Sequence, residues 1–480
     1  MAFLSVEFGV FFLVVAVASF FAEKAAGAGN APGRAVLLFA SVAFYAAADV
    51  RFLPVLAYVS LASYVSGRFV RGGRRAFLAL FVILELLPLL FLKFRGFFPG
   101  GRSGPAFPLG LSFFTLQALS YTIDVFSRRV GVERSFATVA LFVGFFPCVT
   151  SGPIQRARVL LPELKKRRPL SYDHMTCGMK LFAFGAAKKI IVANALAPYV
   201  DAVYADVSRS HGCALFLASV LYSFQIYFDF SGYSDMALGA ARFFGFGLER
   251  NFDHPYLSRS VGEFWRRWHI SLSTWLRDYV YIPLGGNRRG RARGCANLLA
   301  VFLVSGVWHG ASAHFVLWGL LHGALQCARR LLRPARLVRG APAWAQVLLT
   351  FALVSLAWIF FRVERVSDAL LALRKIALAP GELLQFFGGR PSGAAKDALK
   401  ALFGIGAAVG FLSGFARTLF LLGLFLSIDF ATRGADGLRL VGRMPFAARW
   451  GLYALLLWSL CYFVLFGGGA PDADFIYNNF

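Results

Sequence analysis

Charged side chains are scarce in this chain, and their scarcity excludes an ordinary soluble domain. Only 15% of the 480 residues are charged, whereas 58% are hydrophobic; soluble domains carry about a quarter charged residues. The mean hydropathy is correspondingly high, at +0.64. We therefore expect most of the chain to lie in lipid.

Acidic residues are rarer than basic ones, and 24 Asp and Glu against 50 Lys and Arg give a formal net charge of +26. An excess of this size can indicate a nucleic-acid partner. Here, however, the basic residues lie in short loops between long apolar runs and not on one polar face. Anionic lipid and cytoplasmic loops explain them better, so we expect membrane lipid, and no nucleic acid, as a partner.

Several common motifs are missing as well. The six cysteines are scattered without CxxC spacing, which predicts neither a metal site nor a disulfide framework. GxSxG, P-loop, Rossmann and HExxH signatures are absent, so a serine hydrolase, a nucleotide-driven motor and a zinc protease have no support. No basic region or cleavage site precedes Glu23, so the first apolar run is expected to remain as a span. Without an internal repeat or a long Gly/Ser linker, a single domain over residues 1–480 is predicted.

Long apolar runs dominate what is present. A helix needs about 20 apolar residues to cross a bilayer, and by that rule the chain contains ten or more membrane segments. The apolar runs are Phe3–Ala22, Ala35–Ala48, Leu53–Val70, Ala76–Phe94, Leu109–Phe126, Val139–Thr150, Met179–Leu196, Leu215–Phe230, Asn297–Leu325, Trp344–Phe361, Leu402–Ser413, Leu419–Ile428 and Trp450–Phe466. Several are short or interrupted, and polar backbone at membrane depth survives only where protein or a water-filled cavity shelters it. The predicted fold is an all-α, polytopic helical membrane protein with re-entrant or broken helices.

Basic and polar loops give an expected orientation. Four arginines gather at the end of the third run and in the loop after it, namely Arg68, Arg71, Arg74 and Arg75. Because loops rich in Lys and Arg stay in the cytoplasm, this loop is expected there, with the N-terminus outside. Two further polar stretches, Pro153–Tyr172 and Gly285–Gly294, are expected at the surface, facing the cytoplasm or the lipid headgroups.

The stretch Arg250–Asn287 is unlike a lipid-spanning helix. From Ser260 onward, large apolar residues recur at steps of three and four and form one stripe, consisting of Trp265, Trp268, Leu272, Trp275 and Tyr279. This spacing predicts an amphipathic helix at the membrane interface or partly tucked into the protein. His269 borders the stripe, where burial would lower its pKa and leave a neutral imidazole able to accept or donate a proton. A histidine that only caps or packs fits the spacing equally well.

The stretch Val301–Gly323 places three histidines in an otherwise apolar run, namely His309, His314 and His322. Ionisable side chains at bilayer depth are costly and usually face a bundle interior or a wet cavity, so we favour a functional role for His309. Gly306 and Gly310 flank this histidine and would allow close helix packing or a bend; the alternative is a packing motif that carries a histidine along. On one straight helix His322 would be rotated by about 220° around the axis from His309. Either they have different roles or the helix breaks.

Carboxylates interrupt a third apolar stretch, Tyr222–Gly239. Buried carboxylates must be paired or hydrogen-bonded, so Asp229 and Asp235 need partners. Either can orient a histidine or bind one of two arginines, Arg266 and Arg267. A structural polar network that ties helices together is at least as compatible, and we treat both carboxylates as supporting residues.

Two weaker clusters are polar-spotted membrane segments, Pro108–Asp124 and Phe145–Leu164. The first carries Ser112, Thr115, Gln117, Ser120, Tyr121 and Asp124. These side chains can line a tunnel, although Ser and Thr in membrane helices more often bond a neighbouring helix.

Taken together, these stretches resemble the membrane-bound O-acyltransferase (MBOAT) family, and most closely its alginate O-acetylation branch. In chain order, the similar stretches are GLSFFTLQALSYTIDVF, FFPCVTSGPIQRA, GAAKKIIVANALAPYVDAVY, FQIYFDFSGYSDMALGAARFFGF, NFDHPYLSRSVGEFWRRWHISLSTWLRDYVYIPLGGN, SGVWHGASAHFVLWGLLHG, LAWIFFRV and the terminal FIYNNF. They cover nearly the whole chain, with the core motifs at about residues 108–325. The main departure is the tail, where FIYNNF stands in place of an aromatic-rich ending such as FIYFQF.

The resemblance implies a multi-helical membrane fold with a central tunnel and the chemistry of ester formation. The histidine of the WHG motif, His309 after Trp308, would meet the acyl group and the acceptor hydroxyl, and a positioned general base contributes about 10²–10⁴-fold. His269 matches the second family histidine, which can orient the acceptor, share the proton or stabilise the oxyanion. His322 matches a supporting position of the alginate branch, whereas His314 matches none.

The resemblance also implies what the protein works with. Acetyl-CoA or another acyl donor would act as co-substrate on the cytoplasmic side, without any bound cofactor. The acetyl group would cross the bacterial cytoplasmic (inner) membrane to an extracytoplasmic acetyltransferase partner protein and a polysaccharide acceptor. D-alanyl transfer to teichoic acid is the alternative within the class, with fewer similar positions. A transporter or flippase for a lipid-linked glycan, with histidines as proton relays, is the alternative outside it, but no internal repeat supports it.

Overall fold

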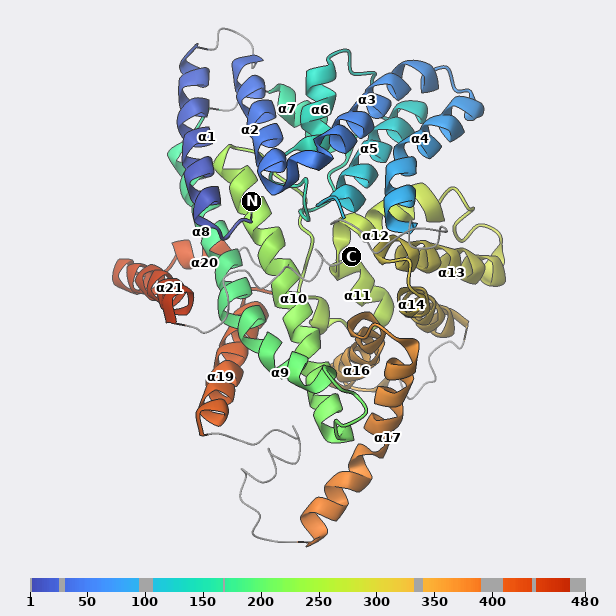
Figure 1. Cartoon of the computed structure of the whole chain (residues 1–480), viewed down its shortest axis with the longest axis vertical. Helices are drawn as coiled ribbons and strands as arrows, with labels where there is room; N and C mark the ends of the chain where they lie inside the picture. Colours follow the sequence, from blue (N-terminus) through green and yellow to red (C-terminus); the bar gives the residue numbers. More distant parts are fainter. Residues whose placement is uncertain are drawn as a thin grey trace. The chain divides into compact units, whose positions relative to one another are not determined.

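Helices are the regular elements of the structure (Figure 1). The computed structural model describes residues 2–25, 31–94, 107–166, 169–331, 340–389, 409–433 and 437–466, and no strand is present within these ranges. The all-α fold class predicted from the apolar runs is therefore confirmed.

Eight helical segments of the described chain are long and apolar enough to cross a membrane, namely Val6–Lys24, Ala31–Val70, Arg75–Phe94, Tyr172–Tyr204, Gly212–Phe243, Ala343–Arg362, Gly414–Ala431 and Phe446–Val464. The second contains two helices that the sequence predicted separately, α2 (Ala31–Asp49) and α3 (Leu53–Val70). The chain is thus a polytopic helical membrane protein, as predicted.

Two of the predicted runs are not separate spans. Leu402–Ser413 and Leu419–Ile428 were expected as two segments, but their described parts belong to one helix, α19 (Val409–Ala431). Residues 402–408 lie outside the described residues, as does the terminal FIYNNF motif.

The chain forms two units. Among the described residues, the first contains residues 2–186 and Tyr233–Asn251, and the second contains Ala187–Gly232 and residues 252–466. The long helix α10 (Gly212–Phe243) contributes its first part to the second unit and its last part to the first. The single domain over residues 1–480 stays a prediction.

The first unit packs several of its helices around a buried one, α5. Its elements are α1 (Val6–Ala25), α2, α3, α4 (Arg75–Phe94), α5 (Leu111–Phe126), α6 (Phe136–Gly144), α7 (Ala157–Lys165) and most of α8 (Tyr172–Ala187). Polar side chains of α5 bond to neighbouring helices: Gln117 Nε2 donates to the Phe142 carbonyl, and Thr122 Oγ1 donates to Glu85 Oε1 at 2.5 Å. At these two positions the polar side chains make the bonds between helices that were the alternative to a tunnel lining.

Part of one predicted surface stretch is buried instead. Within Pro153–Tyr172, residues 153–157 are buried and the Arg156 side chain is 1% exposed. The reason is that this segment joins the core of the first unit, where the Gln155 backbone N–H donates to Gln117 Oε1 at 3.2 Å. The expectation that the whole stretch faces the cytoplasm or the headgroups was therefore wrong. The preceding run, Val139–Thr150, is broken, because the nine-residue α6 gives way to a buried irregular turn.

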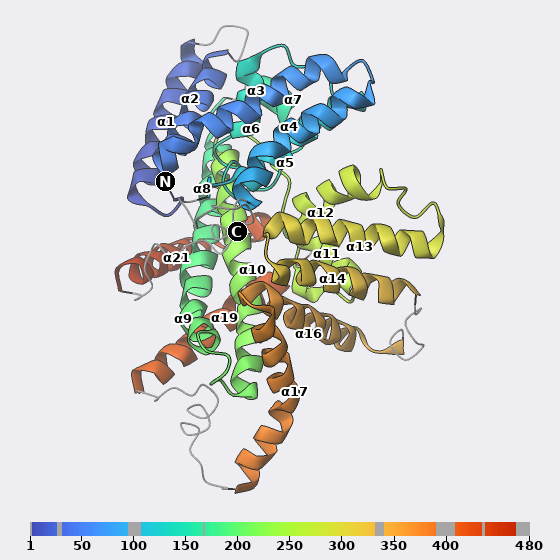
Figure 2. The same cartoon turned by 45° about the vertical axis from the view of Figure 1, so that its right-hand side comes forward.

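The second unit carries the four histidines of the predicted motifs, His269, His309, His314 and His322. Its further elements are α9 (Asn194–Tyr204), α11 (Val261–Arg267), α12 (Ile270–Leu276), α13 (Gly290–His309), α14 (Ala313–Leu331), α16 (Ala343–Arg362), α17 (Val366–Gly389), α19, α20 (Gly437–Gly442) and α21 (Phe446–Phe466). Helices α13 and α14 form a hairpin, and α16 packs beside α14 (Figure 2). The predicted run Asn297–Leu325 is therefore two helices that meet at Gly310–Ser312, and of the two possibilities for His309 and His322 it is the broken helix that occurs.

Two glycines allow the hairpin helices to touch. A Cβ added to Gly306 of α13 would lie 2.4 Å from the Phe315 carbonyl oxygen of α14. A Cβ on Gly319 would lie 2.2 Å from the Phe302 carbonyl oxygen of α13. Only glycine fits at such backbone approaches, which confirms close packing as the use of Gly306.

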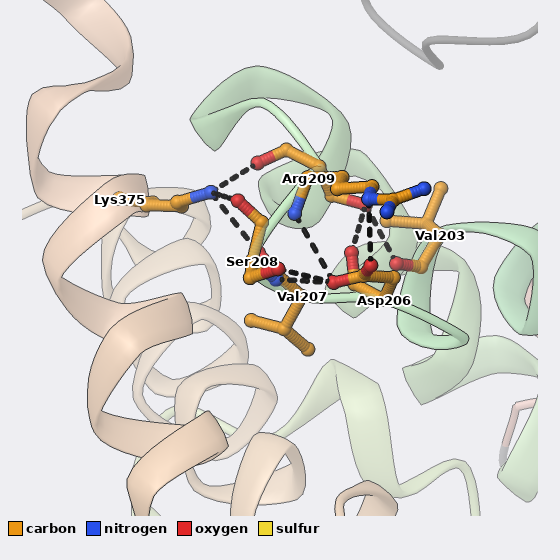
Figure 3. Close-up of polar contacts among 7 residues, drawn as sticks. Val203, Asp206, Val207, Ser208, Arg209 and Lys375 are labelled. Atoms are coloured by element: carbon orange, nitrogen blue, oxygen red, sulfur yellow. Dashed lines mark hydrogen bonds and ion pairs between the residues drawn. The ribbon is translucent and has the colours of Figure 1, made fainter.

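Lys375 of helix α17 binds the loop between α9 and α10 (Figure 3). The Lys375 ammonium donates to the backbone carbonyls of Val207, Ser208 and Ser210 at 3.0, 2.6 and 2.9 Å. The loop is ordered from within by Asp206, whose Oδ1 accepts from the Ser208 backbone N–H at 2.9 Å. One cation thus satisfies three carbonyls that the loop would otherwise leave to water.

Candidate active site

Three histidines and three tryptophans of the second unit alternate along one row of buried rings. In order along the row they are His269, Trp308, His309, Trp318, His322 and Trp265, and we call this set the ring row. Neighbouring ring centroids in this order are 6.1, 4.8, 5.0, 5.1 and 5.0 Å apart. Trp308 contacts both His269 and His309. Trp318 contacts both His309 and His322.

His269 enters the row through a break that the periodicity did not predict. Helix α11 ends at Arg267, and α12 begins at Ile270 after His269, whose φ of 44° lies in the left-handed region. The prediction of one continuous amphipathic helix from Ser260 was therefore wrong. The stripe residues are nevertheless all buried, so the segment is tucked into the protein.

The His269 ring is enclosed by aromatic side chains. The residue is 1% exposed, and its ring stands edge-on to that of Phe230 with centroids 4.7 Å apart. Burial lowers the pKa of His269 to about 3. The imidazole is therefore neutral near pH 7 and can accept or donate a proton.

His309 is the last residue of α13. The helix closes there with the Gly310 N–H donating to the Gly306 carbonyl at 3.1 Å. The residue is 3% exposed, and beyond the ring row its ring meets Phe361 of α16, with centroids 5.1 Å apart. The close crossing of the hairpin and the helix end together fix this imidazole among rings from three helices.

His322 is held by a hydrogen bond from α11. Trp265 Nε1–H donates to His322 Nδ1 at 3.2 Å, and His322 is 0% exposed. Because Nδ1 accepts, the neutral imidazole carries its proton on Nε2.

The remaining histidine of the hairpin has a different environment. His314 Nδ1 lies 3.0 Å from the Phe360 carbonyl oxygen and so ties α14 to α16. No ring of the ring row contacts it among the described ring pairs. The structure thus separates His314 from the other three histidines.

The predicted supporting residues are distributed unevenly. Trp308 lies in the ring row. The buried Asp229 forms an ion pair with Lys189, a partner that the sequence analysis did not name. Arg267 pairs with Glu263 at 2.8 Å.

Two other predicted supporting residues, Arg266 and Asp235, are not buried in the second unit. The Arg266 side chain is exposed. Asp235 belongs to the first unit and is half-buried.

Several residues that contact predicted site residues escaped the sequence analysis. Trp318, Phe361 and Lys189 were not singled out, although Trp318 precedes His322 by four residues, a spacing that puts both on one face of a helix. This spacing could have identified Trp318 as a neighbour of His322 from the sequence alone. Phe361 meets His309, and Lys189 meets Asp229, only through contacts between distant segments of the chain.

Comparison with known proteins agrees with this architecture. The model of the MBOAT, membrane-bound O-acyltransferase family matches residues 74–361, which include the whole ring row. A probable alginate O-acetylase AlgI of Pseudomonas fluorescens is 38% identical over 70% of this chain and 68% of its own length. A peptidoglycan O-acetyltransferase of Helicobacter pylori is 35% identical over 70% of this chain and 72% of its own. A teichoic acid D-alanyltransferase of Bacillus subtilis is 28% identical over 51% of this chain and 65% of its own length.

The chain belongs to the membrane-bound O-acyltransferase family. It is a multi-pass membrane enzyme that transfers acyl groups to hydroxyl oxygens, and the resemblance inferred from the motifs is confirmed. A transporter or flippase is not favoured by any of these similarities.

Proposed function

We propose that this enzyme moves an acetyl group from a donor on the cytoplasmic side of the bacterial inner membrane to a hydroxyl of an extracytoplasmic polysaccharide. The relatives named for O-acetylation of alginate and of peptidoglycan support acetyl, because each aligns with 70% of this chain. Acetyl-CoA is the proposed donor. An extracytoplasmic acetyltransferase protein is the proposed partner that delivers the group to the polymer.

The observation that carries the proposal is the position of His309, buried at the end of α13 within the ring row. In the proposed step an acceptor hydroxyl oxygen attacks the acyl carbonyl carbon while an imidazole nitrogen of His309 takes the hydroxyl proton. The carbonyl electron pair moves to oxygen. When the carbonyl re-forms, the carbon–sulfur bond of the thioester breaks, and His309 returns the proton to the leaving sulfur.

His269 has a supporting task in this scheme. Its neutral ring lies across Trp308 from His309, so it orients the acceptor rather than competing for the same proton. The aromatic rings around both histidines keep water away from the thioester, which otherwise would be hydrolysed.

The test identifies the ester that the enzyme makes. Envelope glycans from cells with and without the chain are treated with mild base, and the released acids are measured by mass spectrometry. The proposal predicts acetate that depends on the chain. Release of D-alanine in place of acetate would show D-alanyl transfer, the alternative activity within the class. Unchanged esters with altered glycan export would overturn acyl transfer to glycans altogether.

A further inference from the structure

Two buried N–H donors of α14 have no acceptor among the residues that the structure describes. They are Trp318 Nε1 and His322 Nε2, on side chains that are 1% and 0% exposed. Buried donors without an acceptor cost free energy, and folded proteins seldom keep them without a functional reason.

The tautomer of His322 decides that its free nitrogen is a donor. Trp265 supplies a proton to Nδ1, so Nε2 of the neutral ring bears the hydrogen and points away from Trp265. With Nδ1 engaged and Nε2 protonated, this imidazole has no basic nitrogen left. His322 is therefore unsuited to the proton transfer that falls to His309.

Both donors belong to the same side of α14. Trp318 and His322 are four residues apart and share one helix face, and their ring centroids are 5.1 Å apart. The Trp318 ring also stands at a right angle to the His309 ring, with centroids 5.0 Å apart. The Trp318 ring thus contacts both the proposed base, His309, and the second donor residue, His322.

We propose that Trp318 Nε1–H and His322 Nε2–H donate hydrogen bonds to the acyl carbonyl oxygen of the donor substrate. This inference rests on the proposed function and names the groups that stabilise its intermediate. When the acceptor oxygen bonds to the carbonyl carbon, the carbonyl electron pair becomes a negative charge on that oxygen. Donors fixed by packing in a site shielded from water stabilise such a charge strongly, since they need no reorganisation.

The experiment uses membrane vesicles that contain the full chain and its natural acceptor system, with labelled acetyl-CoA as the donor probe. Initial rates of ester-linked label give kcat and KM for acetyl-CoA. Trp318→Phe removes the N–H and keeps an aromatic ring. His322→Gln keeps both an acceptor for Trp265 and an N–H donor, whereas His322→Leu keeps neither.

A second tryptophan provides the control. Trp358 of α16 is 0% exposed and stacks on Trp318 with centroids 5.7 Å apart, so Trp358→Phe makes the same exchange in the same packing. Membrane abundance and thermal unfolding are compared for every variant.

The expected result is a loss of about 10²–10³-fold in kcat for Trp318→Phe and for His322→Leu, with KM little changed. His322→Gln should recover most of the rate, and Trp358→Phe should stay near the wild type. A role in packing alone would not distinguish Gln from Leu at position 322.

Three results would overturn the inference. One is a Trp318→Phe enzyme with the wild-type kcat, and another is a His322→Gln enzyme as inactive as His322→Leu. If Trp318→Phe fails to insert, the His322 pair decides alone. Absence of transfer by the wild type would refute the proposed function itself and the inference with it, and so differs from failure of the inference alone.

Discussion

His269 couples folding to pH at the scale of a single side chain. Burial lowers its pKa from 6.5 to about 3, so between these values the unfolded chain binds a proton that the folded chain excludes. The stability from the neutral ring is complete above about pH 6.5 and is lost as the pH falls toward about 3, by up to about 4–5 kcal/mol.

A variant at this position tests that coupling. His269→Asn removes the titrating group, and asparagine tolerates the left-handed backbone at φ 44°. We expect the variant to lose less thermal stability than the wild type on acidification from about pH 7 to 4. Unfolding temperatures of the detergent-solubilised proteins measure the effect. Equal losses in both proteins would contradict the assignment.

Single site residues could be predicted where a polar or ionisable side chain lies in an apolar stretch of sequence. His309 could be chosen because an imidazole is unexpected in an apolar run, whereas His322 was chosen only through the family resemblance. The order of the rings in the ring row could not be predicted, because it depends on contacts that join residues 265, 308 and 318. Asp229 illustrates the same limit, since a buried carboxylate must have a partner, but the sequence does not say that the partner is Lys189.

At the scale of helices, the crossing of α13 and α14 should control activity. Gly319→Ala would place a Cβ 2.2 Å from the Phe302 carbonyl oxygen, so the helices must separate and shift the hairpin that carries His309. We expect a loss of about 1–3 kcal/mol in stability and at least about tenfold in rate. Acyl transfer and thermal unfolding measure the two effects.

Gly451→Ala in α21 is the matched control, because nothing lies within 4 Å of an added Cβ there. Alanine is favoured over glycine in helices by about 1 kcal/mol, so this variant should be neutral or slightly more stable. Similar behaviour of the two alanine variants would mean that the hairpin crossing does not constrain the site.

The attachment of α17 makes a separate prediction. Lys375→Met removes the ammonium from three backbone carbonyls, so amide hydrogen exchange in residues 205–211 should accelerate by about tenfold or more. Arg374→Met, on an exposed neighbour, should leave exchange unchanged. Equal protection in both variants would show that other contacts hold the loop.

Helix breaks were the least predictable elements. The stripe from Trp265 to Tyr279 keeps steps of three and four across the break at His269, so periodicity alone predicts one helix there. The break after His309 was foreseeable as one of two possibilities, because a straight helix could not aim His309 and His322 at one point.

At the scale of the whole molecule, the basic loop after α3 should face the cytoplasm. Gly72 is exposed within it and has room for a side chain. In a Cys461→Ser background, Gly72→Cys should react with a membrane-impermeant thiol reagent only in opened cells or inverted vesicles. Labelling in intact spheroplasts would show that this loop lies outside, opposite to the predicted orientation.

The membrane architecture and the family were the most predictable features of the molecule. Composition alone places the chain in lipid, and the order of motifs along the chain is read without any contact information. The division into segments was less accurate, because hydropathy registers apolar runs, whereas α2 and α3 join end to end and α19 merges two runs.

The most direct test of the central claim compares two histidines of the same hairpin. His309→Ala and His314→Ala are expressed at matched membrane abundance, and ester-linked acetate on envelope glycan is measured. Loss of acetate in His309→Ala, with His314→Ala near the wild type, is the predicted result, because of these two histidines His309 lies in the ring row and His314 does not. Undiminished acetate in His309→Ala would contradict the mechanism.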